Sequence, residues 1–316
     1  MQKLIGIFFL LIQVASVSAE ETSDLFSWNL KERDIHFEMR YPEGKLKALV
    51  LSFDDGMKQD LRLVALLNKY QLRGTFHLNS ARLSTPNYLR VDEVKTAFTG
   101  HEISAHGVNH QGLTGLSSAD VFYEFLEDRR ALEAVSGEII RGMAYPFGRY
   151  DINALENLKS MGFEYARTVN ATGRFEIPQN ALLWHPTAQI FANEEKPLNQ
   201  GRTFKLARDF LTTDSLSLLF LWGHSFEYVD KWEPLEALFS VLSDQSQVSY
   251  LTHIQLVDYL NAYRQLKISS DKTIIHNPSA TSVFLAVTDM RQAQAREKSI
   301  IEIKSGATIT LSSAQK

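Results

Sequence analysis

The chain has 316 residues, of which 44% are hydrophobic and 22% are charged, a composition typical of a folded globular protein. Its formal net charge is -4, so no basic field would attract nucleic acid, and we exclude that partner. Cysteine is absent, which excludes disulfides and thiolate metal ligands. Any metal site must therefore use histidine and carboxylate ligands.

The first 19 residues have the pattern of a secretory signal peptide. Lys3 supplies a positive n-region, residues 4–14 form an apolar stretch, and residues 17–19 make a small-residue cleavage site. The apolar stretch is shorter than the ~20 residues that a membrane span needs. The sequence therefore predicts a cleaved signal peptide at 1–19, export to the periplasm or full secretion, and no transmembrane segment after signal removal.

Short apolar runs alternate with amphipathic stretches from Lys47 to about residue 267. The runs typical of buried strands lie at 48–53, 74–79, 102–105, 142–145, 163–169, 182–190, 216–222 and 248–253. Stretches with helical spacing lie at 61–70, 92–98, 117–135, 152–161, 204–211 and 234–242. This alternation indicates βαβ units and a parallel sheet. Seven or eight units in ~220 residues favour a β/α barrel, with an open doubly wound sheet as the alternative.

The chain divides into a large domain with a small segment on each side. Residues 20–45 are interpreted as an N-terminal lead-in, and residues 46–267 as the β/α domain. After residue 267 polar turns join strand-like segments at 273–275, 282–287 and 299–303. These segments predict a small β-rich C-terminal appendage at 268–316.

Two adjacent carboxylates, Asp54 and Asp55, follow the predicted strand at 48–53 and precede Gly56. In parallel β/α folds the carboxyl ends of the strands are where active sites are built. Adjacent carboxylates repel each other, and a bound cation offsets that repulsion. One aspartate could bind a metal while the other acts as a base; an ordinary turn with a helix-capping aspartate is the alternative.

Two histidines, His106 and His110, follow the predicted strand at 102–105. Gly107 and Asn109 between them favour a loop over a helix. Together with Asp55 they form a His-His-carboxylate set, which suits zinc or another divalent transition metal and leaves positions open for water and substrate. Unconnected surface histidines are the alternative.

Two further segments carry polar or aromatic groups at strand ends. At 144–148, Tyr145 and Phe147 offer a surface on which a sugar could stack, with an ordinary Pro-Gly turn as the alternative. His224 comes directly after an apolar strand and Gly223, so it is predicted to lie at the rim, where it could act as a general acid.

Taken together and in this order, these segments resemble the NodB-type polysaccharide deacetylases, carbohydrate esterase family four. Residues 52–56 look like the motif [TS]FDDG, 106–110 like H[ST]xxH, 144–148 like RxP[YF]G, and 221–224 like LxxH. The similarity extends over most of the β/α domain. It implies a distorted (β/α)7 barrel, a divalent metal that is usually zinc, and removal of acetyl groups from an N-acetylated amino-sugar poly- or oligosaccharide.

The resemblance also implies a role for five residues at the strand ends. Asp54 would be the base that takes a proton from water, and His224 the acid that protonates the leaving group. The metal ligands would be Asp55, His106 and His110.

Substrate contacts are implied as well. Leu221 would line the pocket for the acetyl methyl group, and the backbone N–H of Phe147 would help to bind the oxyanion. Some aromatic side chains are expected to stack on sugar rings and others to be core; the candidates are Tyr145, Phe147, Trp184, Trp222, Phe226 and Trp232.

The chain departs from the family pattern in three places. Gly107 stands where a serine or threonine usually steadies the histidine loop, and Ala144 stands where an arginine normally orients the base. The motif that supplies the carboxylate partner of that arginine has no clear match; residues 184–186 lie in about the right part of the chain. We interpret the chain as a variant subgroup in which Arg167 replaces the missing arginine, with a salt bridge elsewhere on the barrel as the alternative for Arg167.

Two other functions use the same residues. The first is an esterase that acts on O-acetylated polysaccharides, because the metal and water mechanism serves both bonds. The second is a catalytically inactive carbohydrate-binding protein, which the changes at Gly107 and Ala144 favour. Retention of both Asp54 and His224 argues against it, since a binding protein has no need of a base and an acid together.

Overall fold

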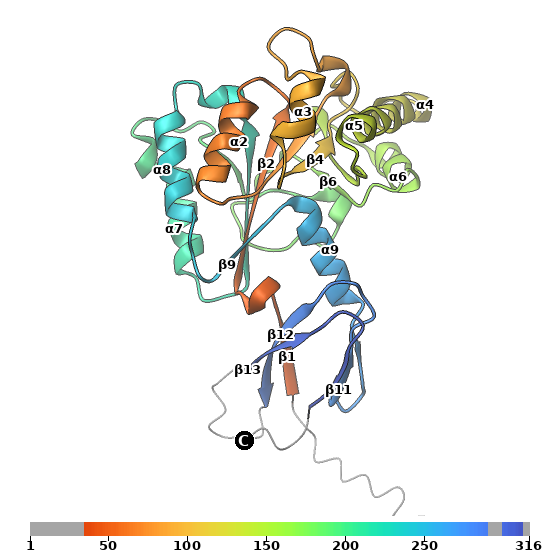
Figure 1. Ribbon diagram of the computed structural model, residues 1–316, viewed down its shortest axis with the longest axis vertical. Coiled ribbons are helices and arrows are strands. Elements are labelled where there is room, and N and C mark those ends of the chain that lie inside the picture. Colours follow the sequence, from red (N-terminus) through yellow and green to blue (C-terminus); the bar gives the residue numbers. More distant parts are fainter. Residues whose placement is uncertain (1–34, 290–298, 312–316) are drawn as a thin grey trace, which may run out of the picture.

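The computed structural model describes residues 35–289 and 299–311 (Figure 1). The signal peptide predicted at 1–19, and the lead-in up to residue 34, lie outside the described residues. Within the described ranges, no helix is both long and apolar enough to cross a membrane.

The centre of the molecule is a parallel sheet of eight strands in the order β6-β5-β4-β3-β2-β8-β7, with β9 paired to the first half of β2. The strands are β2 (Lys47–Asp55), β3 (Gly74–Leu78), β4 (Glu102–Ala105), β5 (Gly142–Ala144), β6 (Tyr165–Arg167), β7 (Ala188–Gln189), β8 (Ser217–His224) and β9 (Val248–Leu251). A parallel bridge between Arg167 and Trp184 joins the segment before β7 to β6. The sheet therefore curls on itself, and the predicted distorted β/α barrel is confirmed.

Helices surround this sheet, and the last helix lies between the sheet and the C-terminal strands (Figure 1). They are α2 (Asp60–Lys69), α3 (Val91–Ala97), α4 (Ser118–Phe122), α5 (Asp128–Ser136), α6 (Ile152–Ser160), α7 (Arg202–Thr212), α8 (Trp232–Leu242) and α9 (His253–Arg264). The helix expected at 117–135 is divided by a π-helical turn at Tyr123–Glu127. Helix α9 was not predicted, because its buried residues are spread around the helix and give no single apolar face.

Alternate residues of the strands face two different cores, as the two-residue period of a strand requires. Leu49, Leu51 and Phe53 of β2 belong to a buried cluster that also contains residues of the surrounding helices, among them α2 and α8. Ala48 and Val50 instead join a second cluster, which includes residues of β8, α9 and the C-terminal strands. A side chain's position along a strand therefore decides whether it faces the surrounding helices, such as α2 and α8, or the barrel interior and α9.

The C-terminal strands form two small antiparallel sheets next to α9 (Figure 1). One sheet has the order β1-β12-β13 and the other β10-β11-β14. The strands are β1 (Ile35–Arg40), β10 (Lys267–Ile268), β11 (Ile274–His276), β12 (Val283–Asp289), β13 (Ser299–Ile303) and β14 (Thr308–Thr310). Strand β1 comes from the predicted lead-in, so the β-rich appendage is built from both ends of the described chain.

The appendage adjoins the beginning of β2 rather than its end. Gly44, just before β2, lies against Ile300 of β13. The hydroxyl of Tyr259 on α9 donates to the carbonyl of Arg40 and accepts from the N–H of Phe284 at 2.9 Å. These contacts place the appendage at the amino ends of the barrel strands, away from the carboxyl ends that carry Asp54 and Asp55.

Candidate metal and acid-base site

The residues singled out by their position in the sequence meet at the carboxyl ends of three strands. Asp54 and Asp55 end β2, His106 follows β4, and His224 ends β8. Asp55 has a φ of 84° and Gly56 a φ of 73°, so the chain turns sharply there and directs the Asp55 carboxylate differently from that of Asp54. Parallel pairing of neighbouring strands thus brings together side chains that are far apart in the sequence.

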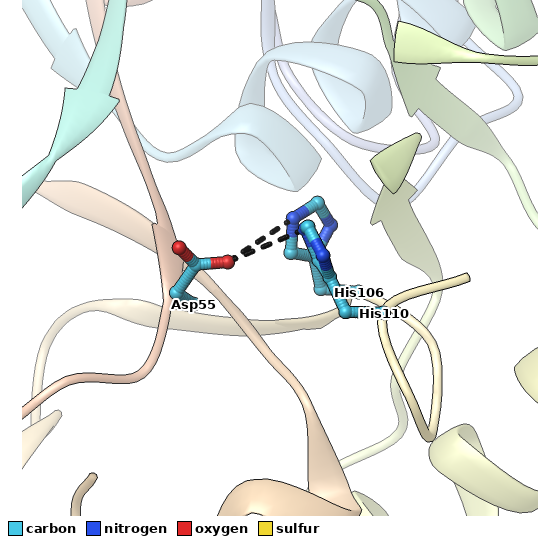
Figure 2. Close-up of side chains that lie close together, drawn as sticks. All are labelled: Asp55, His106 and His110. Atoms are coloured by element: carbon cyan, nitrogen blue, oxygen red, sulfur yellow. Dashed lines mark ion pairs between the residues drawn. The ribbon is translucent and has the colours of Figure 1, made fainter. Parts of the chain in front are cut away.

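Asp55, His106 and His110 point toward one another (Figure 2). Oδ1 of Asp55 is 3.6 Å from Nε2 of His106 and 3.5 Å from Nε2 of His110. Zinc bound tetrahedrally at about 2.0–2.1 Å would hold its ligand atoms about 3.3–3.5 Å apart. The observed spacing therefore fits a single divalent ion, and these three residues could hold one.

The orientation and charge state of the two histidines also suit a metal ligand. Nδ1 of His106 lies 2.8 Å from the carbonyl oxygen of Ala144, so an N–H at Nδ1 donates there and leaves the Nε2 lone pair facing Asp55. Burial lowers the pKa of His106 and lowers that of His110 to about 4. Both rings are therefore neutral near pH 7, which is the state that binds metal.

Asp54 is buried and paired with Arg167. Nη2 of Arg167 donates to both carboxyl oxygens of Asp54, and the Arg167 guanidinium lies over the ring of Trp222, 4.4 Å from its centroid. Burial by itself would raise the pKa of Asp54, but the positive charge of Arg167 and, secondarily, the neighbouring histidines hold it well below its usual range. Asp54 is therefore a carboxylate at neutral pH.

Arg167 reaches Asp54 from the strand next to the one on which the family motif places its arginine. Ala144 on β5 is paired directly with Arg167 on β6. Because Ala144 is small, the space beside Asp54 is left to the guanidinium of its register partner. The ion pair between Arg167 and Asp54 contradicts the alternative, in which Arg167 forms a salt bridge elsewhere on the barrel.

His224 faces the two aspartates and has a carboxylate behind it. Its Nε2 is 4.0 Å from the nearest oxygens of Asp54 and Asp55, and its Nδ1 is 3.2 Å from Oε2 of Glu227. Burial lowers the pKa of His224, but Glu227 and the aspartates outweigh it and raise the pKa overall. These carboxylates thus stabilise the protonated form of the ring relative to that of an isolated histidine. Glu227, which Gln189 also contacts at 3.0 Å, was not singled out from the sequence.

Two aromatic side chains at the site have solvent-exposed rings. Phe147 is 61% exposed and Phe226 is 39% exposed. The Phe147 ring lies 4.4 Å from that of His110, and the Phe226 ring lies 5.0 Å from that of His224. They therefore offer surfaces beside the candidate metal ligand His110 and beside the expected acid, His224.

The other predicted sugar-stacking residues are buried, which contradicts that role. Tyr145 and Trp184 are almost completely inaccessible, and the Tyr145 hydroxyl donates to the carbonyl of Leu182 at 2.9 Å. Trp222 is also buried, with Arg167 over its ring. A ring must have an open face to stack on a sugar, so these three predictions were wrong. Trp232 lies on α8, with the Arg62 guanidinium 4.5 Å from its centroid.

The predicted role of Leu221 in the acetyl pocket was also wrong. Leu221 packs with Leu219 in the cluster beneath the helices, so it faces away from the barrel interior. Residues two apart on a strand share a face, and the residue on the His224 side is therefore Trp222. The two-residue period of β8 indicates this orientation, whereas the match to the LxxH motif does not.

A polar network lies inside the barrel and was not predicted. Oγ of Ser52 is 3.0 Å from Nε2 of His77. Further along, the Tyr165 hydroxyl donates to Glu102 at 2.6 Å and accepts from the hydroxyl of Ser104 at 2.9 Å. These side chains alternate with apolar residues that face the helices, so the strands had been interpreted from their apolar half alone.

The family model described as polysaccharide deacetylase matches residues 41–166. This part of the chain is therefore similar in sequence to the polysaccharide deacetylases. The match covers the aspartate, histidine and Pro-Gly motifs, and the resemblance predicted from them is confirmed.

Similar proteins carry the same family name. YxkH of Bacillus subtilis (strain 168), a curated protein named for polysaccharide deacetylation, is 23% identical over 124 residues, which are 39% of this chain and 44% of YxkH. The chain thus matches less than half the length of that deacetylase relative.

Among solved structures, one from Mycobacterium smegmatis named for the same family covers 71% of this chain and 93% of its own. It has a TM-score of 0.55 and 18% identity, which supports the deacetylase fold. A Bacillus anthracis structure named as a CE4 family pseudoenzyme covers 69% of this chain and 66% of its own, with a TM-score of 0.46 and 16% identity.

Proposed function

We propose that this protein is a metal-dependent hydrolase that removes acetyl groups from an N-acetylated amino-sugar poly- or oligosaccharide. The match of residues 41–166 to the polysaccharide deacetylase family model supports carbohydrate deacetylation in general. The observation that carries the finer proposal is the convergence of His106 and His110 on one oxygen of Asp55. Beside this cluster lie a buried carboxylate, Asp54, and a histidine with a raised pKa, His224.

The ligands of the metal would be Asp55, His106 and His110, and zinc is the ion that this set suits best. When bound, such an ion supplies Lewis-acid polarisation of the acetyl carbonyl and lowers the pKa of water. With three protein ligands, positions remain open for water and substrate.

Asp54 and His224 would handle the protons. Asp54, held as a carboxylate by Arg167, takes the proton from the attacking water. His224, whose pKa is raised by Glu227 and the aspartates, gives a proton to the leaving amine nitrogen. Acid-base catalysis of this kind contributes roughly 10²–10⁴-fold to the rate. Arg167 acts as a positioning residue, because it contacts Asp54 and fixes both its orientation and its charge.

The substrate would lie across the rim between Phe147 and Phe226. Their exposed rings provide the apolar faces on which a sugar ring can stack. The backbone N–H of Phe147 would help to bind the oxyanion, a contact whose loss typically costs ~10²–10³ in rate.

Acetate release tests this function and separates it from the two alternatives. The zinc-loaded protein is expected to release acetate from N-acetylglucosamine oligosaccharides, and a chelator-treated sample is expected to release none. Release from acetylated xylan alone would instead identify an O-acetyl esterase. Glycan affinity and bound metal without release from either substrate would identify an inactive carbohydrate-binding protein.

We also propose export of the protein, on the pattern of residues 1–19. Sequencing of the mature amino terminus from periplasmic and extracellular fractions is expected to begin at Glu20. A mature chain that begins at Met1 would contradict cleavage.

A further inference from the structure

The loop that carries both histidine ligands is attached to the molecule through its backbone N–H groups. It runs from His106 to His110 and turns at Gly107, whose φ is 84°. Glycine is the residue that adopts this left-handed conformation without strain. Gly107 has no side chain that could bond to the loop, so other residues must hold it.

One of these residues is Asp128, the first residue of α5, which is completely buried. Its Oδ2 accepts from the N–H groups of His106 and Gly107, both at 2.9 Å. Its Oδ1 accepts from the N–H of Ser80 at 2.8 Å. Asp128 therefore ties the start of the ligand loop to the loop that follows β3.

The second is Glu124, buried in the π-helical turn. Its Oε2 accepts from the N–H of Asn109 at 2.9 Å, and its Oε1 accepts from the side-chain amide of Asn109 at 2.7 Å. Its own carbonyl oxygen accepts from the N–H of Val108 at 2.9 Å. Four consecutive N–H groups, from residue 106 to residue 109, are thus bound by two residues of one helical segment.

We propose that Glu124 and Asp128 are positioning residues that hold His106 and His110 in metal-binding geometry. They would take over the steadying part that a serine or threonine at position 107 plays in the family motif. This inference rests on the metal site proposed above. In this proposal, the helical segment that follows the loop fixes the loop's position, because Gly107 has no side chain with which to do so.

The glycine and the glutamate fit each other. A Cβ at residue 107 would lie 3.0 Å from Oε2 of Glu124, which is closer than ordinary van der Waals contact. A side chain at position 107 would therefore push the carboxylate away from Asn109. The π-helical turn lies directly between α4 and α5, and such turns occur frequently at functional sites.

Glu124→Gln and Asp128→Asn test the proposal, with Glu127→Gln as the control. A carboxylate has two acceptor oxygens, whereas an amide has one oxygen and one NH₂ group, which is a donor. In each variant the new NH₂ group therefore faces an N–H group that the carboxylate oxygen had accepted from. Glu127 lies on the same helical segment but contacts Arg130 at the surface, at 2.7 Å. We expect Zn²⁺ affinity, measured by competition with a chelator, to fall about 10–100-fold in the two variants and to stay unchanged in the control.

A second variant and a second measurement guard against misfolding. Gly107→Ala keeps both carboxylates but displaces Glu124, and it too should weaken Zn²⁺ binding. In metal-free protein, amide hydrogen exchange at Gly107 and Asn109 should be faster in Asp128→Asn and Glu124→Gln, respectively. Unchanged Zn²⁺ affinity in folded Glu124→Gln and Asp128→Asn would overturn the proposal. Absence of Zn²⁺ binding in the unaltered protein would contradict the proposed metal site. Unchanged exchange rates in the two variants would then also contradict the role of Glu124 and Asp128 in holding the loop.

Discussion

Asp54 and Asp55 are neighbours in the sequence but lie in different environments. Asp54 is enclosed by the barrel and pairs with Arg167, whereas Asp55 turns toward His106 and His110. A strand directs successive side chains to opposite faces, and the positive φ of Asp55 adds a further turn. Two carboxylates of the same chemical kind therefore suit two tasks, one as a base and the other as a metal ligand.

Asp54→Asn separates these tasks. The amide cannot take a proton from water, so we expect kcat for acetate release to fall roughly 10²–10⁴-fold while bound zinc is retained. Asp55→Asn should instead lose zinc, because it removes a charged ligand. Metal content by elemental analysis and acetate release together measure this. Loss of zinc in Asp54→Asn with retention in Asp55→Asn would show that the two roles are reversed.

Glu227 is expected to set the alkaline limit of activity through His224. Glu227 is among the groups that raise the pKa of His224, and an acid works only while it is protonated. Glu227→Gln therefore lowers the His224 pKa, and activity should be lost at a lower pH as the pH rises. A pH profile of kcat measures the shift, with the exposed Glu233→Gln as the control. An alkaline limb that stays in place would remove His224 as the acid.

At the scale of single elements, the pairing of β5 with β6 explains a departure that the motif alone left open. Ala144 and Arg167 are register partners, so an arginine on either strand lies beside Asp54. The sequence identified Arg167 as a candidate, but strand register is a property of the folded sheet and could not be predicted from the spacing of residues 144 and 167.

Arg167→Ala should impair both turnover and stability. Asp54 would be left as a buried charge without its main partner, and breaking such a pair costs about 3–5 kcal/mol. We expect a large fall in kcat and a lower free energy of unfolding, measured by acetate release and by denaturant titration. The exposed Arg174→Ala serves as the control.

Ala144→Arg in the Arg167→Ala background provides the matched rescue. It returns a guanidinium from the paired position on β5, so part of both losses should be recovered. Full kcat in Arg167→Ala alone would refute a positioning role for Arg167.

The motifs at the strand ends could be predicted from the sequence because each combines unusual residue types with a strand boundary. Matching a motif by residue type does not show to which side of the sheet a side chain points, and Leu221 is an example. Burial of Tyr145 and Trp184 depends on packing between distant segments, which composition does not reveal. Strand β1 was missed although Ile35, Phe37 and Met39 alternate with polar residues.

At the scale of the whole molecule, the appendage shares a core with the barrel. Leu285 of β12 lies in the same buried cluster as Val50 of β2, Phe220 of β8 and Leu256 of α9. The Tyr259 hydroxyl bonds to both β1 and β12. These contacts indicate that the appendage stabilises the amino end of the barrel.

Leu285→Ala tests this shared core. Removing a buried leucine side chain typically costs 2–5 kcal/mol, and a shared core predicts that the loss appears in a single cooperative unfolding transition. Ile274→Ala, at an exposed position of β11, is the control and should have a small effect. Chemical denaturation followed by tryptophan fluorescence and circular dichroism measures both. Two separate transitions, with the barrel unaffected, would show that the appendage folds independently.

In the proposed function, deacetylation depends on one metal site formed by Asp55, His106 and His110. Zinc binding to the unaltered protein and to His110→Ala, followed by acetate release from the same samples, tests it most directly. We predict a single tightly bound ion in the unaltered protein, and loss of both tight binding and acetate release in folded His110→Ala. Undiminished zinc affinity and acetate release in His110→Ala would show that His110 is not a metal ligand and that deacetylation does not depend on this site.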